Sequence, residues 1–160
     1  MKNIAVTVIV GFITGLVISG ILFDVIKYVG KSFNRVSVSW NISKAEKAYS
    51  NERFSDSVLI YRKTLPKISS DNKILLAKTK NNLALSMLKN IEKESNINLS
   101  DNAEKPSNIS DNVLLEIEEI LDLLNQANDL YIETGNTELS AQTTKNIQII
   151  ESFLSKDKKS

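Results

Sequence analysis

The chain has 160 residues, a formal net charge of +1, and neither cysteine nor histidine. The lack of cysteine excludes disulfides, thiolate nucleophiles and Cys-based zinc sites, and the lack of histidine removes the usual general base near neutral pH and the commonest metal ligand. We therefore expect no enzyme, no metal site and no cofactor, and the near-neutral charge gives no case for a nucleic-acid partner.

The first predicted element is a transmembrane helix over residues 4–23, preceded by a short N-terminal tail, residues 1–3. The run IAVTVIVGFITGLVISGILF holds no charged residue. At a rise of about 1.5 Å per residue, its length matches a hydrocarbon core of roughly 30 Å. The run exceeds the apolar region of a typical signal peptide, and no A-x-A-like cleavage site follows it. We therefore expect an uncleaved, single-pass membrane anchor.

Small side chains recur along one side of this anchor, at Thr7, Gly11, Gly15 and Ser19. Gly11 and Gly15 form a GxxxG pair, which lets two helix backbones approach closely. The stripe predicts helix packing in the membrane, either between copies of the chain as a homo-oligomer or with another membrane subunit. The alternative is that small residues are simply common in membrane helices.

Residues 24–42 form a predicted collar in which basic and aromatic residues alternate. Aromatic rings are amphipathic and long cationic side chains snorkel, so both favour the headgroup region of a membrane. We expect ordinary interfacial anchoring here, with a specific anionic-lipid site as the alternative. The residues predicted to lie at the membrane interface are Lys27, Tyr28, Lys31, Phe33, Arg35 and Trp40.

The distribution of positive charge around the anchor bears on its orientation. Lys27, Lys31 and Arg35 follow the anchor, whereas Lys2 precedes it. The excess after the anchor favours a cytoplasmic helical domain. A lysine close to the start is also common in anchors with a cytoplasmic N-terminus, so the opposite orientation stays open.

The pattern changes to amphipathic helices from Ser43 onward. Ser43 and Glu46 form a capping-box pattern, in which the serine oxygen and the carboxylate bind exposed backbone amides reciprocally. This pattern predicts the start of a first helix that runs to about Asn51. Ser55 or Asp56 is expected to cap the second helix.

A proline and a polar insertion divide the next part of the chain. The second helix is expected to close near Pro66, and Ser70 or Asp71 to cap a third helix that runs to about Lys93. Residues 95–112 are rich in Asn, Ser and Asp and show no hydrophobic periodicity. They predict a flexible insertion, longer than most loops in a compact domain.

Two further helices complete the predicted domain. The fourth begins near Asp111 and stops at Gly135, a residue type that favours the position after a helix end. Asn136 or Thr137 is expected to cap the fifth. The polar tail, residues 156–160, follows.

The sequence thus predicts an all-α chain, with one transmembrane helix followed by about five helices in antiparallel hairpins over residues 43–155. Apolar and small residues at helical spacing define the buried faces of these helices. The expected inner residues are Ala45, Ala48, Tyr49, Val58, Tyr61, Leu65, Leu76, Leu83, Ala84, Met87, Ile91, Leu114, Ile117, Leu121, Leu124, Tyr131, Ile147, Ile150 and Leu154.

The first two helices carry the pattern Ala45-x-x-Ala48-Tyr49-x-x-x-x-Phe54-x-x-Ser57-x-x-x-Tyr61-x-x-x-Leu65. This pattern resembles a tetratricopeptide repeat, in which small residues let two antiparallel helices approach and aromatic residues fill the gaps. The match is good at four positions and weaker at two, where that family favours Ala. The four are Ala45, Phe54, Tyr61 and Leu65; the two are Ser57 and Thr64.

A second, partial repeat starts with Asn81-Asn82-Leu83-Ala84 and ends with the residues from Leu124 to Asn136. The insertion lies between its two halves, which such repeats normally join by a short turn. The resemblance spans roughly residues 43–154. It implies a short array of helical hairpins that binds a protein or peptide segment.

Six residues are candidates for partner binding. Lys44, Tyr49, Lys80 and Asn81 are expected on the concave face, and Glu116 and Glu119 on the acidic face of the fourth helix. With no histidine and no E-x-x-H partner helix, the carboxylates predict a solvated surface rather than a metal site. The basic early helices and the acidic fourth helix either face each other or present opposite patches to a protein.

These patterns favour a membrane-anchored adaptor that holds a protein partner at the membrane surface during assembly, quality control or transport. The alternative is a structural accessory subunit of a larger membrane complex, held through its transmembrane helix. In that case the Gly11 and Gly15 stripe would be the main interface.

Overall fold

The computed structural model describes residues 35–97 and 109–155, and every regular element within them is helical. The packed part is one compact unit that begins at Val38. The five described helices confirm the all-α prediction. They cover residues 35–50, α2 (Phe54–Thr64), α3 (Lys73–Ser95), α4 (Asp111–Glu133) and α5 (Thr137–Ser155), with a short 3₁₀ helix, η1 (Leu65–Lys67), after α2.

The predicted anchor, residues 4–23, and its stripe of small side chains lie outside the described residues. The same holds for the collar up to residue 34, whereas Arg35 and Trp40 fall in the helix of residues 35–50. None of the helices in the described ranges has the length and apolar character needed to cross a membrane. The anchor and the orientation stay predictions.

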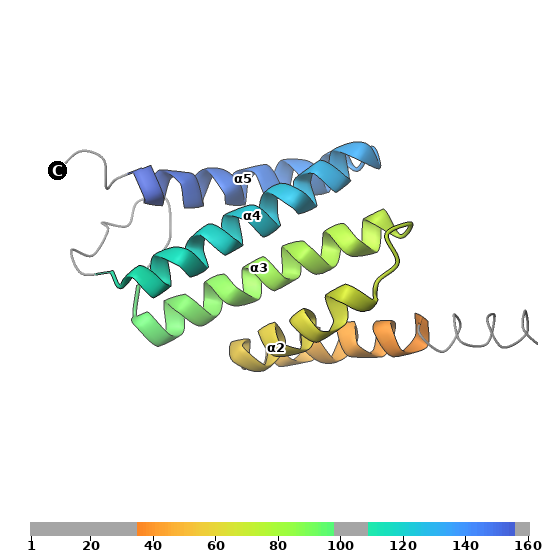
Figure 1. Cartoon of the computed structure of the whole chain (residues 1–160), viewed down its shortest axis with the longest axis horizontal. Coiled ribbons are helices and arrows are strands. Elements are labelled where there is room, and N and C mark those ends of the chain that lie inside the picture. Colours follow the sequence, from red (N-terminus) through yellow and green to blue (C-terminus); the bar gives the residue numbers. More distant parts are fainter. Residues whose placement is uncertain (1–34, 98–108, 156–160) are drawn as a thin grey trace, which may run out of the picture. The chain divides into compact units, whose positions relative to one another are not determined.

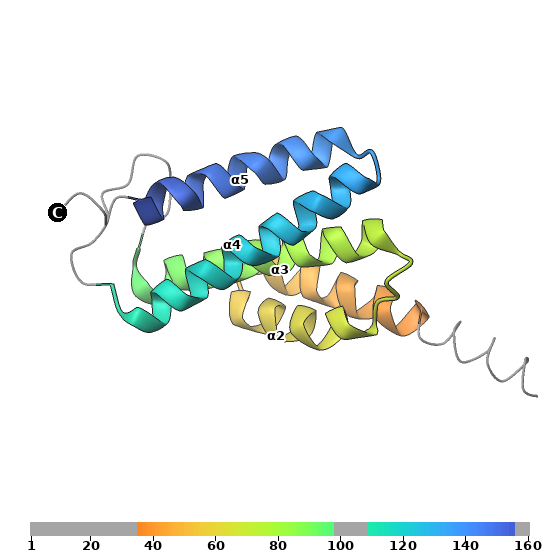
Figure 2. The ribbon, with the colours of Figure 1, turned by 45° about the horizontal axis from the view of Figure 1, so that its top comes forward.

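Helices that follow one another in the chain pack side by side and run antiparallel (Figures 1 and 2). The extensive contacts join α2 to α3, α3 to α4, and α4 to α5. Stacking of neighbours in sequence is the general pattern of helical-hairpin arrays. Although the insertion lies between them in the sequence, α3 and α4 pack together and make the most extensive of these contacts.

One apolar cluster runs through all five helices and holds the unit together. It contains Ala45 from the first helix, Tyr61 from α2, Leu83 from α3, Leu124 from α4 and Phe153 from α5, each at most 2 % exposed. A smaller cluster of Ala77, Ala127 and Tyr131 joins α3 to α4. Each helix therefore contributes its apolar face to a core that no single hairpin could bury alone.

Hydroxyl groups occupy two buried positions where the resembled family favours Ala. Ser57 is fully buried, donates to the backbone oxygen of Ala45 at 3.0 Å, and lies 3.0 Å from the hydroxyl of Ser86. Thr64, also fully buried, donates to the backbone oxygen of Ile60 at 2.7 Å. Both buried hydroxyls are thus satisfied, which removes the cost of placing them in the core.

The first helix starts earlier than predicted. Residues 35–50 are helical and Ser43 is an exposed residue in their midst, so the capping-box prediction is wrong. The physical reason is that the buried stripe continues upstream of Ser43. Val38, 4 % exposed, and Ile42, which packs on the core, precede Ala45 at spacings of seven and three residues, which keeps one helix face apolar.

Two other helix caps lie one to three residues from the predicted positions. The N-cap of α2 is Arg53, without a side-chain capping bond, and Ser55 and Asp56 lie inside the first turn. The N-cap of α3 is Asn72, whose side chain accepts from the backbone of Leu75 at 3.3 Å, rather than Ser70 or Asp71. Any short polar side chain can fill this role, so neighbouring candidates compete.

The C-terminal hairpin follows its sequence signals closely. α4 begins at Asp111 after the capping residue Ser110, and Asn136 caps α5 by accepting from the backbone of Leu139 at 3.4 Å. Part of the predicted insertion is packed, because Ile97 is only 8 % exposed and belongs to the main core. The structure does not describe residues 98–108.

The helix of residues 35–50 and α4 end in the same way. Backbone amides of Arg53 and Asn136 donate to carbonyls five residues earlier, at 2.9 and 2.8 Å. Both turns need a residue with positive φ, and these are Glu52 at 56° and Gly135 at 70°. Glycine adopts this conformation freely, whereas a side chain such as that of Glu52 is strained there.

Replacement of Glu52 by glycine is therefore expected to raise the free energy of unfolding by about 0.5–1 kcal/mol. The matched control is Gly135→Ala, which we expect to lower the free energy of unfolding by about 1 kcal/mol. Apart from the adjacent residues of the chain, no atom lies within 4 Å of the Cβ that this alanine would add, so the loss comes from the backbone alone. Urea unfolding of the full chain in mild detergent measures both. A destabilised Glu52→Gly variant would show that the side chain of Glu52 matters more than its backbone strain.

Candidate binding surfaces

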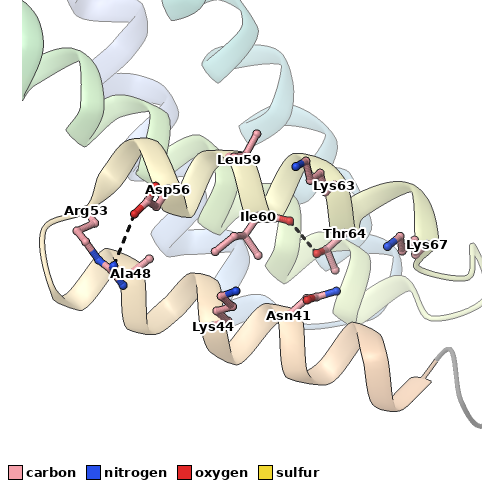
Figure 3. A pocket seen from close by; sticks show the side chains of 10 residues that line it. All are labelled: Asn41, Lys44, Ala48, Arg53, Asp56, Leu59, Ile60, Lys63, Thr64 and Lys67. Atoms are coloured by element: carbon pink, nitrogen blue, oxygen red, sulfur yellow. Dashed lines mark hydrogen bonds and ion pairs between the residues drawn. The ribbon is translucent and has the colours of Figure 1, made fainter.

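A groove of about 520 Å³ lies between the helix of residues 35–50 and α2. Figure 3 shows its ten lining side chains along these two antiparallel helices, with Arg53 at one end and Lys67 at the other. Ala48, Ile60 and Thr64 line its inner part, and Thr64 is fully buried. We call this surface the basic groove.

Positive charge dominates the basic groove. Its lining includes the four cations Lys44, Arg53, Lys63 and Lys67 but a single carboxylate, that of Asp56. Asp56 lies 3.7 Å from Arg53, and both side chains are more than half exposed. Such an exposed pair contributes little, and the four cations outnumber the one carboxylate of the lining. The groove therefore suits an anionic ligand.

Exposed apolar side chains border the basic groove. The ammonium group of Lys44 lies 5.2 Å from the ring centroid of Trp40, a cation–π distance. Trp40 is 64 % exposed, and Leu59, which lines the groove from α2, is 52 % exposed. Cations beside exposed apolar groups make this surface amphipathic.

A second hollow, of about 310 Å³, opens where α2, α3 and α4 meet. Its floor is apolar, formed by Val58 and Met87, and its rim carries Arg62, Asn90 and Glu116. We call it the three-helix hollow. Leu59 belongs to both hollows because it lies on the ridge of α2 between them. An apolar floor with a few polar groups around it is the usual composition of a binding site.

Arg62 fixes one side of this hollow. Its guanidinium donates to the carboxylate of Glu119 at 2.7 Å and lies 3.8 Å from the sulfur of Met87. The two charged side chains are about half exposed, so the pair orients the rim more than it stabilises the fold. Glu116 is left on the rim as a carboxylate available to a ligand.

A smaller pocket, of about 150 Å³, lies beside Tyr49, Tyr61 and Asn82. The hydroxyl of Tyr61 accepts a hydrogen bond from the side chain of Asn82 at 3.4 Å. Burial disfavours the phenolate and raises the pKa of Tyr61 to about 12, against an ordinary value of 10.0, although the bond from Asn82 acts in the opposite direction. The pocket is too small to hold more than one side chain of a partner.

The raised pKa of Tyr61 predicts a loss of stability at high pH. Between about pH 10 and pH 12 the unfolded chain releases the phenolic proton while the folded chain keeps it, so the free energy of unfolding falls as pH rises. The expected loss is about 2 kcal/mol. Tyr61→Phe is the control, because it lacks the phenolic proton but keeps the aromatic ring. Its lysines titrate over the same pH range as those of the unmodified chain, so their contribution cancels. Unfolding of both proteins across this range gives the difference; parallel curves would contradict the burial effect.

The residues predicted for a shared concave face are distributed over several surfaces. Lys44 lines the basic groove, whereas Tyr49, on the same helix, lines the small pocket beside Asn82 of α3. Lys80 donates to the side chain of Gln126 on α4. The structure thus does not bring Lys44, Tyr49 and Lys80 together at one site.

Asn81 also has a partner inside the fold, since its side-chain oxygen accepts from the hydroxyl of Thr143 at 3.3 Å. It joins α3 to α5. Glu116 and Glu119 do lie close together, at the three-helix hollow and in the pair with Arg62. Whether any of these residues binds a partner stays a prediction.

The basic and acidic helices face each other, which was one of the two alternatives. Arg62 on α2 pairs with Glu119 on α4, and Lys73 on α3 pairs with Glu133 on α4. Nevertheless α4 keeps exposed carboxylates, among them that of Asp122. No group of three or more residues suited to hold a metal ion occurs in the described ranges.

Sequence reasoning missed the groove residues Arg53, Lys63 and Lys67 as a set. The available signal was the spacing of four residues between Lys63 and Lys67, because residues four apart lie on the same side of a helix.

No family model, curated protein or solved structure matches the chain. Its function therefore has to be inferred from the chemistry of these surfaces.

Proposed function

We propose that this chain is a membrane-anchored, tetratricopeptide-like adaptor that binds a protein partner at the membrane surface. The observation that carries the proposal is the three-helix hollow, an opening of about 310 Å³ with an apolar floor. In this proposal residues 4–23 hold the array at the membrane, and the partner is one that undergoes assembly, quality control or transport there.

The chemistry of the hollow suits a protein side chain. Val58 and Met87 offer an apolar floor, bordered by the exposed Leu59, and the volume of about 310 Å³ accommodates one large aliphatic or aromatic side chain of a partner. Met87 is unbranched and adapts its shape to a ligand at low cost. Glu116 and Asn90 on the rim then supply hydrogen bonds that fix the orientation of the partner segment.

The rim also sets a preference for charge. The carboxylate of Glu116 favours a cation on the partner, whereas the nearby guanidinium of Arg62 is already paired with Glu119. We therefore expect a partner segment with one large apolar side chain flanked by Lys or Arg.

A photo-crosslinking side chain at Ser55, which lines the three-helix hollow, tests this function in the full-length chain in its native membrane. The control position is Gln148, an exposed residue on α5. We expect one protein adduct from Ser55 that is absent from Gln148. Glu116→Arg should reduce the yield of that adduct about tenfold or more, because it removes an attractive charge and adds a repulsive one.

Equal adducts from Ser55 and Gln148, or an adduct unaffected by Glu116→Arg, would contradict the proposal. A replacement of residues 4–23 by an unrelated anchor separates the tether from the binding surface. Retention of the Ser55 adduct is expected. Its loss would instead favour an accessory subunit held through its transmembrane helix.

A further inference from the structure

The basic groove is a separate surface from the three-helix hollow, and its lining carries the opposite excess of charge. Of the five ionisable side chains that line it, four are cationic, and Asp56 is matched by Arg53. Only Leu59 is shared with the other hollow. A partner with a basic segment, as proposed for the three-helix hollow, would be repelled here.

The apolar groups at this groove indicate which anionic ligand fits. Trp40 is 64 % exposed beside Lys44, and Leu59 is 52 % exposed beside Lys63. Tryptophan and lysine together are typical of surfaces that lie in the headgroup region of a membrane. A membrane surface can contact these apolar groups and the cations at the same time.

The length of the chain points to the same ligand. Asn41, on the groove, follows Phe23, the last residue of the predicted anchor, by 18 residues. Even a fully extended segment of this length spans only about 60 Å. An anchored chain therefore keeps the groove at a high local concentration of lipid headgroups, whatever other anions are present.

We infer that the basic groove binds the headgroups of anionic phospholipids, so that the first hairpin lies against the membrane surface. This inference rests on the membrane anchor of the proposed function. Each Lys or Arg close to an anionic leaflet strengthens the association by about fivefold at physiological ionic strength. The excess of cations over carboxylates in the groove attracts the hairpin to the anionic surface, whereas the exposed carboxylates of α4, such as Glu118 and Asp122, are repelled.

Trp40 provides the readout, because it is the single tryptophan of the chain. The full-length chain is reconstituted into vesicles of phosphatidylcholine, with and without phosphatidylglycerol, and acrylamide quenching of Trp40 is measured. We expect the quenching constant to fall at least about twofold when the anionic lipid is present, and to recover at high salt, because salt screens these charges.

The test variant is Lys63→Glu with Lys67→Glu, and the control is Lys78→Glu with Lys145→Glu. Lys78 and Lys145 are exposed residues on α3 and α5, so both double variants change the net charge equally. In vesicles with phosphatidylglycerol, we expect the groove variant to reduce the fraction of chains whose groove is bound to headgroups about tenfold or more. The control is expected to behave as the unmodified chain. Circular dichroism confirms that both variants are folded.

Quenching that does not depend on lipid charge, or that both double variants change alike, would overturn the inference. Flotation with neutral vesicles tests the anchor separately. A chain that floats with neutral vesicles but shows no effect of phosphatidylglycerol has the anchor without the groove function. A chain that floats with anionic vesicles alone has the groove function without the anchor.

Discussion

Replacement of Phe153 by alanine is expected to lower the free energy of unfolding by about 3–5 kcal/mol. The ring of Phe153 is 2 % exposed and belongs to the core cluster that joins all five helices. Alanine leaves a cavity there, and α5 is the last of the described helices, packed against α4. A small unit has little stability to lose, so we expect α5 to detach from α4 at moderate urea concentrations.

Leu154 is the matched control, because it is the next residue on α5 and is only partly buried against the same cluster. For Leu154→Ala we expect a loss of about 1–2 kcal/mol, in proportion to its smaller buried area. Urea unfolding of the full chain, followed by circular dichroism in mild detergent, measures both. An equal effect of the two variants would show that α5 does not insert Phe153 into the core.

Replacement of Ser57 by leucine is expected to cost about 3 kcal/mol. Ser57 is fully buried and lies within hydrogen-bond distance of both neighbouring helices, through Ala45 and Ser86. A larger side chain at this position has to push the helix of residues 35–50 away from α2 and α3. The cost comes from steric overlap rather than from the lost hydroxyl.

Ser57→Ala separates these two causes. Ser86 keeps a hydrogen bond to the backbone oxygen of Asn82 at 2.7 Å, so the alanine variant leaves no buried donor without an acceptor. We expect it to change the stability by no more than about 1 kcal/mol. If alanine were as destabilising as leucine in urea unfolding, the lost hydrogen bond rather than the close helix approach would explain most of the destabilisation.

The sequence predicted the C-terminal helices well because local signals agreed there. The start of α4 near Asp111, the capping by Asn136 and the positive φ of Gly135 all appear in the structure. Each of these is a property of a few adjacent residues. They therefore require no knowledge of the tertiary fold.

The start of the first helix was mispredicted because two signals competed. Ser43 and Glu46 match a capping box, but Val38 and Ile42 extend the buried stripe upstream, and tertiary packing prevailed. Phe153 was missed for a related reason. Both residue 153 and residue 154 continue the face of Ile150, and only the neighbouring helices decide which of them is buried.

The surfaces could be predicted only in part because each is built from more than one helix. The basic groove combines Lys44 with Lys63, which the sequence separates by a turn. Lys80 and Asn81, predicted for partner binding, also make contacts with Gln126 and Thr143 that the sequence did not indicate. Pairings of this kind depend on how helices rotate against each other, and periodicity alone does not determine that rotation.

The most direct test of an adaptor with two separate surfaces compares two variants in the same membrane. Glu116→Arg and the double variant Lys63→Glu, Lys67→Glu are each examined for the Ser55 adduct and for lipid-dependent quenching of Trp40. We predict that Glu116→Arg loses the adduct and keeps the lipid effect, and that the double variant does the reverse. Loss of both properties in either folded variant would contradict two independent surfaces.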